Sequence, residues 1–327
     1  MLRMLVFVIS LTIGNGAVFA QADGDWQACN DGRNPVAAIA ACTRLIDAGI
    51  LGDLSLATAL YNRGVHFANV AEIDRAIADE SRAIQIEPLH PRAYNARGNA
   101  YYKKGDVEHA IQDYDAQIKI TPRHEDAYNG RGRAYAAMGE LDRAIEDYDQ
   151  QIEIDPRHAH AYNNRGRAYA LRGELDRAIE DYDQQIEIDA QHPDAYNNRG
   201  NAYLGKGDPD RAIKDYDAVI PMNSRHAHAF SNRGRAYLAK GLFDRAIQDF
   251  DAQLEIDPRN ANAYIGRALV YMTLRYPSRA LVDAERALEL QPKEPFLLQM
   301  RGNILMALGR REEALTDLRE VLKGRGP

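Results

Sequence analysis

Asparagine recurs along the chain at a fixed interval of 34 residues, in two rows whose side chains are suited to binding a peptide. The first row consists of Asn95, Asn129, Asn163 and Asn197, and the second row consists of Asn164, Asn198 and Asn232. A side-chain amide carries both a donor and an acceptor, so it can pair with the backbone of an extended ligand. The rows therefore predict peptide binding. The simpler interpretation is that asparagine is only a tolerated exposed residue.

Arginine and apolar residues accompany these rows. Arg133, Arg167 and Arg235 keep the same register, and their positive charge would favour ligands with acidic segments. Towards the C-terminus the equivalent positions and their neighbours become apolar, at Ile265, Leu269, Met272, Phe296 and Met300. This apolar group predicts a site for a hydrophobic anchor of a partner. Packing within the last two repeats is the alternative.

Eight arginines and eight aspartates also share the interval. The arginines are Arg63, Arg97, Arg131, Arg165, Arg199, Arg233, Arg267 and Arg301, and the aspartates are Asp79, Asp113, Asp147, Asp181, Asp215, Asp249, Asp283 and Asp317. In the preceding repeat both are missing, with Cys29 and Leu45 in their places. This joint loss predicts a partly buried ion pair within each of the eight repeats. The alternative is a row of free guanidinium groups that bind ligand carboxylates.

Histidine recurs as well, at His90, His124, His158, His192 and His226. Packed helices lie about 10 Å apart, too far for successive repeats to share a zinc ion held by bonds of about 2 Å. We therefore expect no metal and no cofactor, with a metal or pH sensor as a distant alternative. The chain also lacks a nucleophile motif and a phosphate-binding glycine loop, so we do not expect an enzyme.

The elements that must position these residues are pairs of short helices. Tyr162, Gly166 and Tyr169 have helical spacing, and a second helical stripe follows from Leu175 to Ile186. Glycines such as Gly139 are expected to end the first helix of a pair, because they tolerate positive φ. Asp155-Pro156 should end the second helix, and Pro221 should end its own helix early.

A period of 34 residues is typical of a stacked array. The unit from Glu125 resembles the tetratricopeptide repeat, through Tyr128, Gly132, Tyr135, Ala144, Tyr148 and Pro156. The resemblance implies an all-α, right-handed α-solenoid of about nine helix-turn-helix repeats. Residues 21–56 would form a degenerate first repeat, and residues 57–327 would form eight repeats in one superhelical domain. In this family the first helix of each repeat lines the ligand-binding surface, which would include the asparagine rows.

The two cysteines occupy related places in that register. Cys29 and Cys42 fall in the first repeat where the two helices of the family's repeat touch. A disulfide between them is therefore expected, and closing a loop of this size contributes roughly 3 kcal/mol. Free thiols or a metal site are the alternatives.

The N-terminus reads as a secretory signal. Arg3 precedes an apolar run over residues 4–13, and Val18-Phe19-Ala20 offers a cleavage site, so residues 1–20 are expected to be removed on export to the periplasm. An uncleaved anchor is the alternative. The net charge of -7 argues against nucleic-acid binding through bulk charge.

The function expected from these observations is a non-enzymatic scaffold that binds an extended peptide or a partner protein. After removal of the signal it would not insert into a membrane. The alternative is a structural component that self-assembles into a homo-oligomer through its C-terminal repeats.

Overall fold

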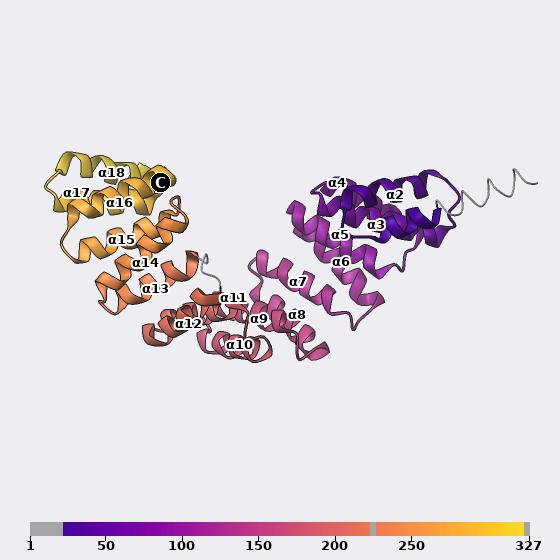
Figure 1. Cartoon of the computed structure of the whole chain (residues 1–327), viewed down its shortest axis with the longest axis horizontal. Helices are drawn as coiled ribbons and strands as arrows, with labels where there is room; N and C mark the ends of the chain where they lie inside the picture. The colour runs from indigo at the N-terminus through magenta and orange to yellow at the C-terminus, as the bar shows by residue number, and fades with distance from the viewer. Residues whose placement is uncertain (1–21, 223–226, 324–327) are drawn as a thin grey trace, which may run out of the picture. The chain divides into compact units, whose positions relative to one another are not determined.

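The computed structural model describes residues 22–222 and 227–323, and their regular secondary structure is entirely helical (Figure 1). Residues 22–30 form one helix, which pairs with α2 (Pro35–Asp47) in the first repeat. The first helix of each later repeat, called helix A, is α3 (Asp53–Asn69), α5 (Pro91–Lys104), α7 (Glu125–Ala137), α9 (Ala159–Leu171), α11 (Pro193–Gly205), α13 (Ala227–Ala239), α15 (Ala261–Thr273) and α17 (Pro295–Ala307). The second, helix B, is α4 (Ile73–Ile86), α6 (Val107–Ile120), α8 (Leu141–Ile154), α10 (Leu175–Ile188), α12 (Pro209–Met222), α14 (Phe243–Ile256), α16 (Pro277–Leu290) and α18 (Arg311–Lys323). The predicted solenoid of helix-turn-helix repeats is confirmed.

Two sequence expectations concern export and the membrane. The predicted signal peptide, residues 1–20, lies outside the described residues. Within the described ranges, no helix has both the length and the hydropathy to span a bilayer.

One backbone position after helix A adopts positive φ throughout. Gly139 has φ 79°, and Gly105, Gly173, Gly207, Gly241 and Gly309 are similar. Ala71 and Arg275 hold the same position in their repeats with φ 62° and 64°. The turn therefore depends on the positive φ, and two repeats adopt it without glycine.

Helix B ends where predicted, with one exception. α8 stops at Ile154, before Asp155-Pro156. The expectation that Pro221 shortens its helix is wrong, because α12 contains Pro221 and is 14 residues long, the same length as α8. Pro221 lies in the last turn, so only Met222 of α12 follows the lost hydrogen bond and the ring contact that a proline introduces.

Helices A and B of a repeat cross at a glycine. A Cβ added to Gly132 would lie 2.7 Å from Cε1 of Tyr148, and one added to Gly98 would lie 2.9 Å from the same atom of Tyr114. Both tyrosine side chains are buried. The small residue and the aromatic residue of the repeat pattern are thus complementary parts of one contact.

All eight predicted arginine–aspartate pairs are present, and each joins helix A to helix B through two hydrogen bonds. In one of them, Nε and Nη2 of Arg199 lie 3.0 and 2.6 Å from the two oxygens of Asp215. The aspartates are buried. The alternative of a row of free guanidinium groups is therefore wrong.

The same arginines also join neighbouring repeats, which the sequence reasoning missed. Nη1 of Arg199 donates to Asp183 of the preceding repeat at 2.5 Å. Other arginines donate to an aspartate in the same way, for example in the pairs Arg131–Asp115, Arg233–Asp217 and Arg267–Asp251. The side chain of Asp183 is 48% exposed, whereas that of Asp215 is 7% exposed. One arginine thus has a buried and an exposed partner.

The predicted disulfide between Cys29 and Cys42 is present, with Cα atoms 4.9 Å apart. Both cysteines are fully buried beside Ala41 and Leu45. The ring of His66 in α3 lies 2.9 Å from the carbonyl oxygen of Cys29. This contact links the first repeat to the second.

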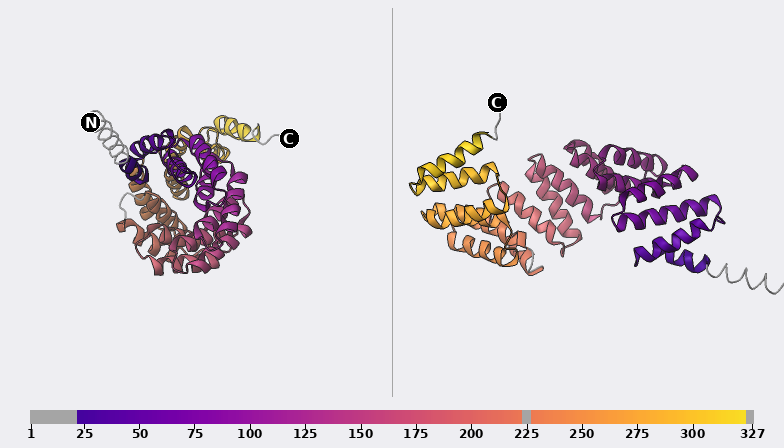
Figure 2. Two further views of the ribbon diagram at one scale, coloured as in Figure 1. Left: turned by 90° about the vertical axis from the view of Figure 1, so that its right-hand side faces the viewer. Right: turned by 90° about the horizontal axis from the view of Figure 1, so that it is seen from above.

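The chain divides into two compact units, Met1–Asn164 and Arg165–Pro327. In the first unit α3 contacts α5 and α5 contacts α7, and in the second unit α11 contacts α13 and α13 contacts α15. Successive B helices make no comparable contacts within the described part of either unit. The stacking of α13 to α18, coloured orange to yellow, can be followed in Figure 2. The helices α3, α5 and α7 of the first unit, and α11, α13 and α15 of the second, thus each form a continuous surface, called the helix A face. That both units form one superhelical domain remains a prediction.

Candidate functional site

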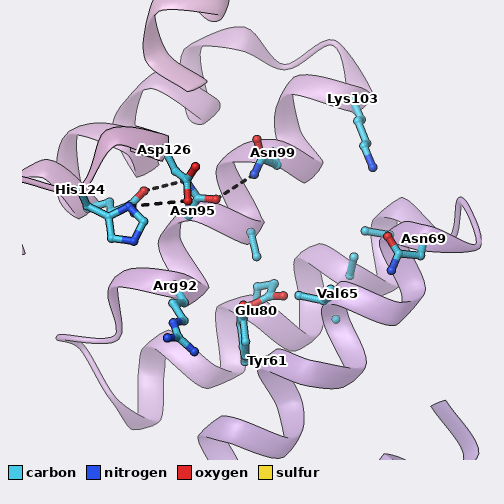
Figure 3. Close-up of a pocket in the computed structure, with 15 residues that line it drawn as sticks. Tyr61, Val65, Asn69, Glu80, Arg92, Asn95, Asn99, Lys103, His124 and Asp126 are labelled. Carbon is cyan, nitrogen blue, oxygen red and sulfur yellow. Dashed lines mark hydrogen bonds and ion pairs between the residues drawn. The ribbon is translucent and has the colours of Figure 1, made fainter. Parts of the chain in front are cut away.

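Each unit has a pocket on its helix A face. The first, of about 480 Å³, lies over α3 and α5, and residues of α4, α6 and α7 also line it (Figure 3). Tyr61 and Val65 of α3 face Asn95 and Asn99 of α5 across it. Arg92 and Lys103 are exposed and lie on opposite sides of the drawn pocket (Figure 3). The pocket therefore combines polar, charged and apolar groups.

The floor of the first pocket carries a buried carboxyl group. Glu80 of α4 is 1% exposed, and neither of its oxygens has a hydrogen-bond partner among the described residues. Burial raises the pKa of the Glu80 carboxyl well above its ordinary value of 4.5; Asp79 and Asp113 raise it too, while Arg97 lowers it. An unpaired buried carboxyl is energetically unfavourable, so this position is a candidate for ligand binding.

Amide groups in the first pocket form a short chain of hydrogen bonds. Nδ2 of Asn95 donates to Oε1 of Gln117 at 2.8 Å, and Nδ2 of Asn99 donates to Oδ1 of Asn95 at 2.9 Å. Asn99 in turn accepts a bond from the hydroxyl of Tyr114 at 2.9 Å. Asn95 is thus held by its neighbours at the edge of the pocket.

The second pocket, also about 480 Å³, lies on α13 and α15. Asn232 and Arg235 of α13 and Ile265 and Leu269 of α15 line it, which brings together four of the predicted site residues. Gln253 also lines this pocket and is fully buried. Neither Nε2 nor Oε1 of its amide has a hydrogen-bond partner among the described residues. This pocket has a largely apolar wall around a buried amide.

Members of the two asparagine rows bond to each other across repeats. Nδ2 of Asn164 donates to Oδ1 of Asn129, and Nδ2 of Asn232 donates to Oδ1 of Asn197, both at 3.0 Å. Each bond leaves the N–H groups of the accepting residue, Asn129 or Asn197, and the oxygen of the donating residue, Asn164 or Asn232, for other contacts. Each half-buried pair therefore presents a fixed donor and a fixed acceptor.

The remaining predicted site residues differ in their surroundings. Arg133 and Arg167 are exposed on helix A, and the guanidinium of Arg133 lies 5.0 Å from the ring centroid of Tyr102. Asn163 and Asn198 are half-buried and have interactions within the chain. The structure places none of these four in the two pockets described above.

The predicted apolar site at the C-terminus is divided. Met300 is buried in the core of the last repeats, and Met272 and Ile265 pack against that core. Phe296 is 53% exposed and Leu269 is 40% exposed. Self-assembly through this end of the chain remains a prediction.

Four of the recurring histidines, His90, His124, His158 and His192, lie directly before a helix A, and His226 lies outside the described residues. Nδ1 of His90 accepts the backbone N–H of Ala93 at 3.1 Å, and Nδ1 of His158 accepts that of Ala161 at 3.2 Å. Burial lowers the pKa of His90, which favours the neutral ring that can accept this bond. Over residues 22–222 and 227–323, no cluster of three or more possible ligands could hold a metal ion.

Sequence reasoning missed Glu80, Gln117 and Gln253. A signal for Glu80 exists, because five other repeats have Tyr or Phe at its position, as at Tyr114 and Phe250. The glutamines also keep the 34-residue interval, but their burial at the floor of the pockets depends on packing between repeats.

The sequence matches models of one repeat family. "TPR repeat" matches residues 98–139, 132–173 and 166–207, and "Tetratricopeptide repeat" matches residues 197–261 and 298–325, together more than half of the chain. No protein with a curated function matches.

Solved structures with similar folds include a tetratricopeptide repeat protein from Parabacteroides merdae, at 19% identity and a TM-score of 0.63 over 77% of this chain and 99% of that one. Another is a chain of the APC/C hetero-tetramer Cut9-Hcn1, at 19% identity and a TM-score of 0.61 over 83% of this chain and 53% of that one. MamA is 30% identical over 50% of this chain and 95% of that one, with a TM-score of 0.47.

Proposed function

Because this chain belongs to the tetratricopeptide repeat family, we propose that it is a non-enzymatic interaction scaffold whose helix A face binds an extended segment of a partner protein. The repeat fold itself suggests a protein–protein interaction scaffold. The proposal adds the binding surface and the form of the ligand.

The asparagine pairs carry the proposal. Asn129–Asn164 in the first unit and Asn197–Asn232 in the second are each fixed by a hydrogen bond of 3.0 Å. A fixed side chain loses less conformational entropy on binding than a free one. The donor and acceptor left on each pair match the N–H and C=O groups of a peptide backbone. Such contacts hold a chain without reading its sequence.

The pockets would supply the sequence preference. In the second unit, the apolar wall formed by Ile265 and Leu269 suits an apolar side chain of the ligand, and Arg235 suits a nearby acidic one. The amide of Gln253 would then pair with the ligand backbone or a polar side chain, which would satisfy its buried donor and acceptor.

A binding experiment tests this proposal. The full chain is immobilised and exposed to a pool of random nonapeptides, and the retained peptides are measured by mass spectrometry. Replacing Asn129, Asn164, Asn197 and Asn232 together by alanine should reduce retention by about tenfold or more, since each lost hydrogen bond is worth about 1 kcal/mol.

The matched control replaces Gln150 and Gln184 by alanine. Both are exposed amides on helix B, one in each unit, so their loss should leave retention unchanged. Equal retention by the asparagine variant with intact helicity, or no retention by the unsubstituted chain, would contradict the proposal.

We also propose that the protein works in the cell envelope after export. The apolar run after Arg3 supports an export signal, and the Cys29–Cys42 disulfide suits an oxidising compartment. Cell fractionation with N-terminal sequencing tests this proposal. A chain that stays in the cytosol with its first 20 residues attached would contradict it.

A further inference from the structure

Glu80 interrupts a pattern that other repeats keep. At the equivalent place Tyr114 packs on Gly98 and Tyr216 packs on Gly200. Their hydroxyl groups donate to Asn99 and Asn201 of the same repeats. In the repeat of Glu80 the residue at the position of Asn99 is Val65. The substitution therefore places an acid where an aromatic ring normally fills the space, and also removes its usual polar partner.

The pocket above Glu80 has a lining that suits a long side chain with a charged end. Val65, Ala68 and Ala96 line its wall and offer apolar surface. Tyr61 lies beside the carboxyl group, as Figure 3 shows. The methylene stems of lysine and arginine pack on apolar surface while their charged ends seek a partner. A guanidinium or ammonium group can also lie over a tyrosine ring.

The charges near Glu80 favour a cation. Asp79 and Asp113 are close enough to raise the pKa of Glu80, and Arg97 opposes them. Arg97 is already paired with Asp113 through bonds of 2.8 and 2.7 Å. Asp79 is paired with Arg63 in the same way, through bonds of 2.7 and 2.9 Å. Arg92 and Lys103 are exposed, whereas Glu80 is buried. The acidic group left without a partner at the floor, among the described residues, is therefore Glu80, and a positive group that reaches it would supply that partner.

We propose that the first pocket binds a basic side chain, of lysine or arginine, from the extended peptide held on the helix A face, and that Glu80 is its ion-pair partner. The inference rests on the proposed peptide-binding function. The pair would satisfy both oxygens of Glu80, for which the described part of the chain offers no partner. Arg92 and Lys103 would contact ligand carbonyl or carboxylate groups on either side.

Other side chains fit the pocket less well. An acidic side chain would place two carboxyl groups side by side, and one of them would have to stay protonated. An aliphatic side chain would leave Glu80 without a partner. A glutamine side chain could accept a bond from a protonated Glu80, so it is the informative rival.

The test uses five synthetic nonapeptide pools with degenerate flanks and a central Lys, Arg, Gln, norleucine or Glu. Retention of each pool by the immobilised full chain is measured by mass spectrometry. We expect the Lys and Arg pools to be retained about tenfold more than the norleucine and Glu pools, as a charge-assisted hydrogen bond predicts.

Two variants connect the preference to Glu80. Glu80→Gln keeps the shape and removes the charge, while Glu80→Tyr restores the residue of the neighbouring repeats and fills the space over Gly64. Both should abolish the preference for the basic pools. Glu146→Gln makes the same chemical change at an exposed position of α8, and it should leave the preference intact.

The outcomes separate the two proposals. If the unsubstituted chain retains all five pools equally, or prefers the Gln pool, this inference is wrong while peptide binding stands. If it retains no pool, peptide binding itself is wrong. If the basic preference persists in both Glu80 variants with intact helicity, another acidic group is responsible and the assignment to Glu80 is overturned.

Discussion

Arg199 is held between two aspartates that differ in exposure, so one residue can separate the effects of a buried and an exposed ion pair. Removing Asp215 leaves a largely buried guanidinium without its bidentate partner, and Asp215→Ala should destabilise the fold by about 3 kcal/mol. Removing the half-exposed Asp183 should cost less than about 1 kcal/mol, because water screens and replaces that contact. Denaturant unfolding followed by circular dichroism measures both variants. Equal losses would show that burial does not control the strength of these pairs.

The second prediction at the residue scale concerns pH and Glu80. Burial raises the pKa of Glu80 in the folded chain, so the folded state binds its proton more tightly than the unfolded state. The stability due to this proton is fully present below the unfolded pKa near 4.5. It is lost as the pH rises through the folded pKa.

Glu80→Gln cannot ionise and should not show this loss. We expect the variant to match the natural chain near pH 4 and to exceed it at pH 8 by the cost of ionising the buried carboxyl, which is about 1.4 kcal/mol for each unit between the folded and unfolded pKa. The comparison cancels contributions from other titrating groups, including the raised pKa of Asp113. Parallel stability curves over this range would contradict the burial of an unpaired carboxyl.

At the scale of the elements, the turn after helix A depends on a left-handed backbone. Ala71 adopts φ 62° at a position where six of the other repeats have glycine. A side chain in this conformation costs about 1 kcal/mol or more, so Ala71→Gly should raise stability by roughly 1 kcal/mol. Gly139→Ala, at the equivalent turn between α7 and α8, should lower it by a similar amount. Thermal unfolding of both variants checks the opposite signs.

The order of these elements could be predicted from the sequence because the same pattern of residues recurs in one repeat after another. The paired loss of arginine and aspartate in the first repeat identified the ion pairs, and the repeat register identified the disulfide. The prediction for Pro221 was wrong because this proline lies in the last turn of α12, where it disturbs little of the helix. Glu80 was missed because its importance depends on the lack of a hydrogen-bond partner for its buried carboxyl group among the described residues. The lack of a partner can be seen only once Val65 and the neighbouring repeat are in place.

At the scale of the whole molecule, stability is built from contacts between neighbours. Bonds such as Arg131–Asp115 join one repeat to the next, and His66 joins the second repeat to the first. In such arrays stability is close to a sum of repeat and interface contributions. A local change should therefore stay local, and an end repeat should open before the others.

The disulfide offers the sharpest test of this locality. The first repeat has a small core around Cys29, Cys42 and Leu45, and a loop of this size stabilises it by about 3 kcal/mol. Reduction of the bond, or replacement of both cysteines by alanine, should speed amide hydrogen exchange in α2 by roughly a hundredfold. Exchange in α8 should be unchanged, because no contact connects α2 to it directly. Faster exchange in both helices would mean that the first unit opens as one cooperative block, and unchanged exchange in α2 would mean that its packing holds without the covalent bond.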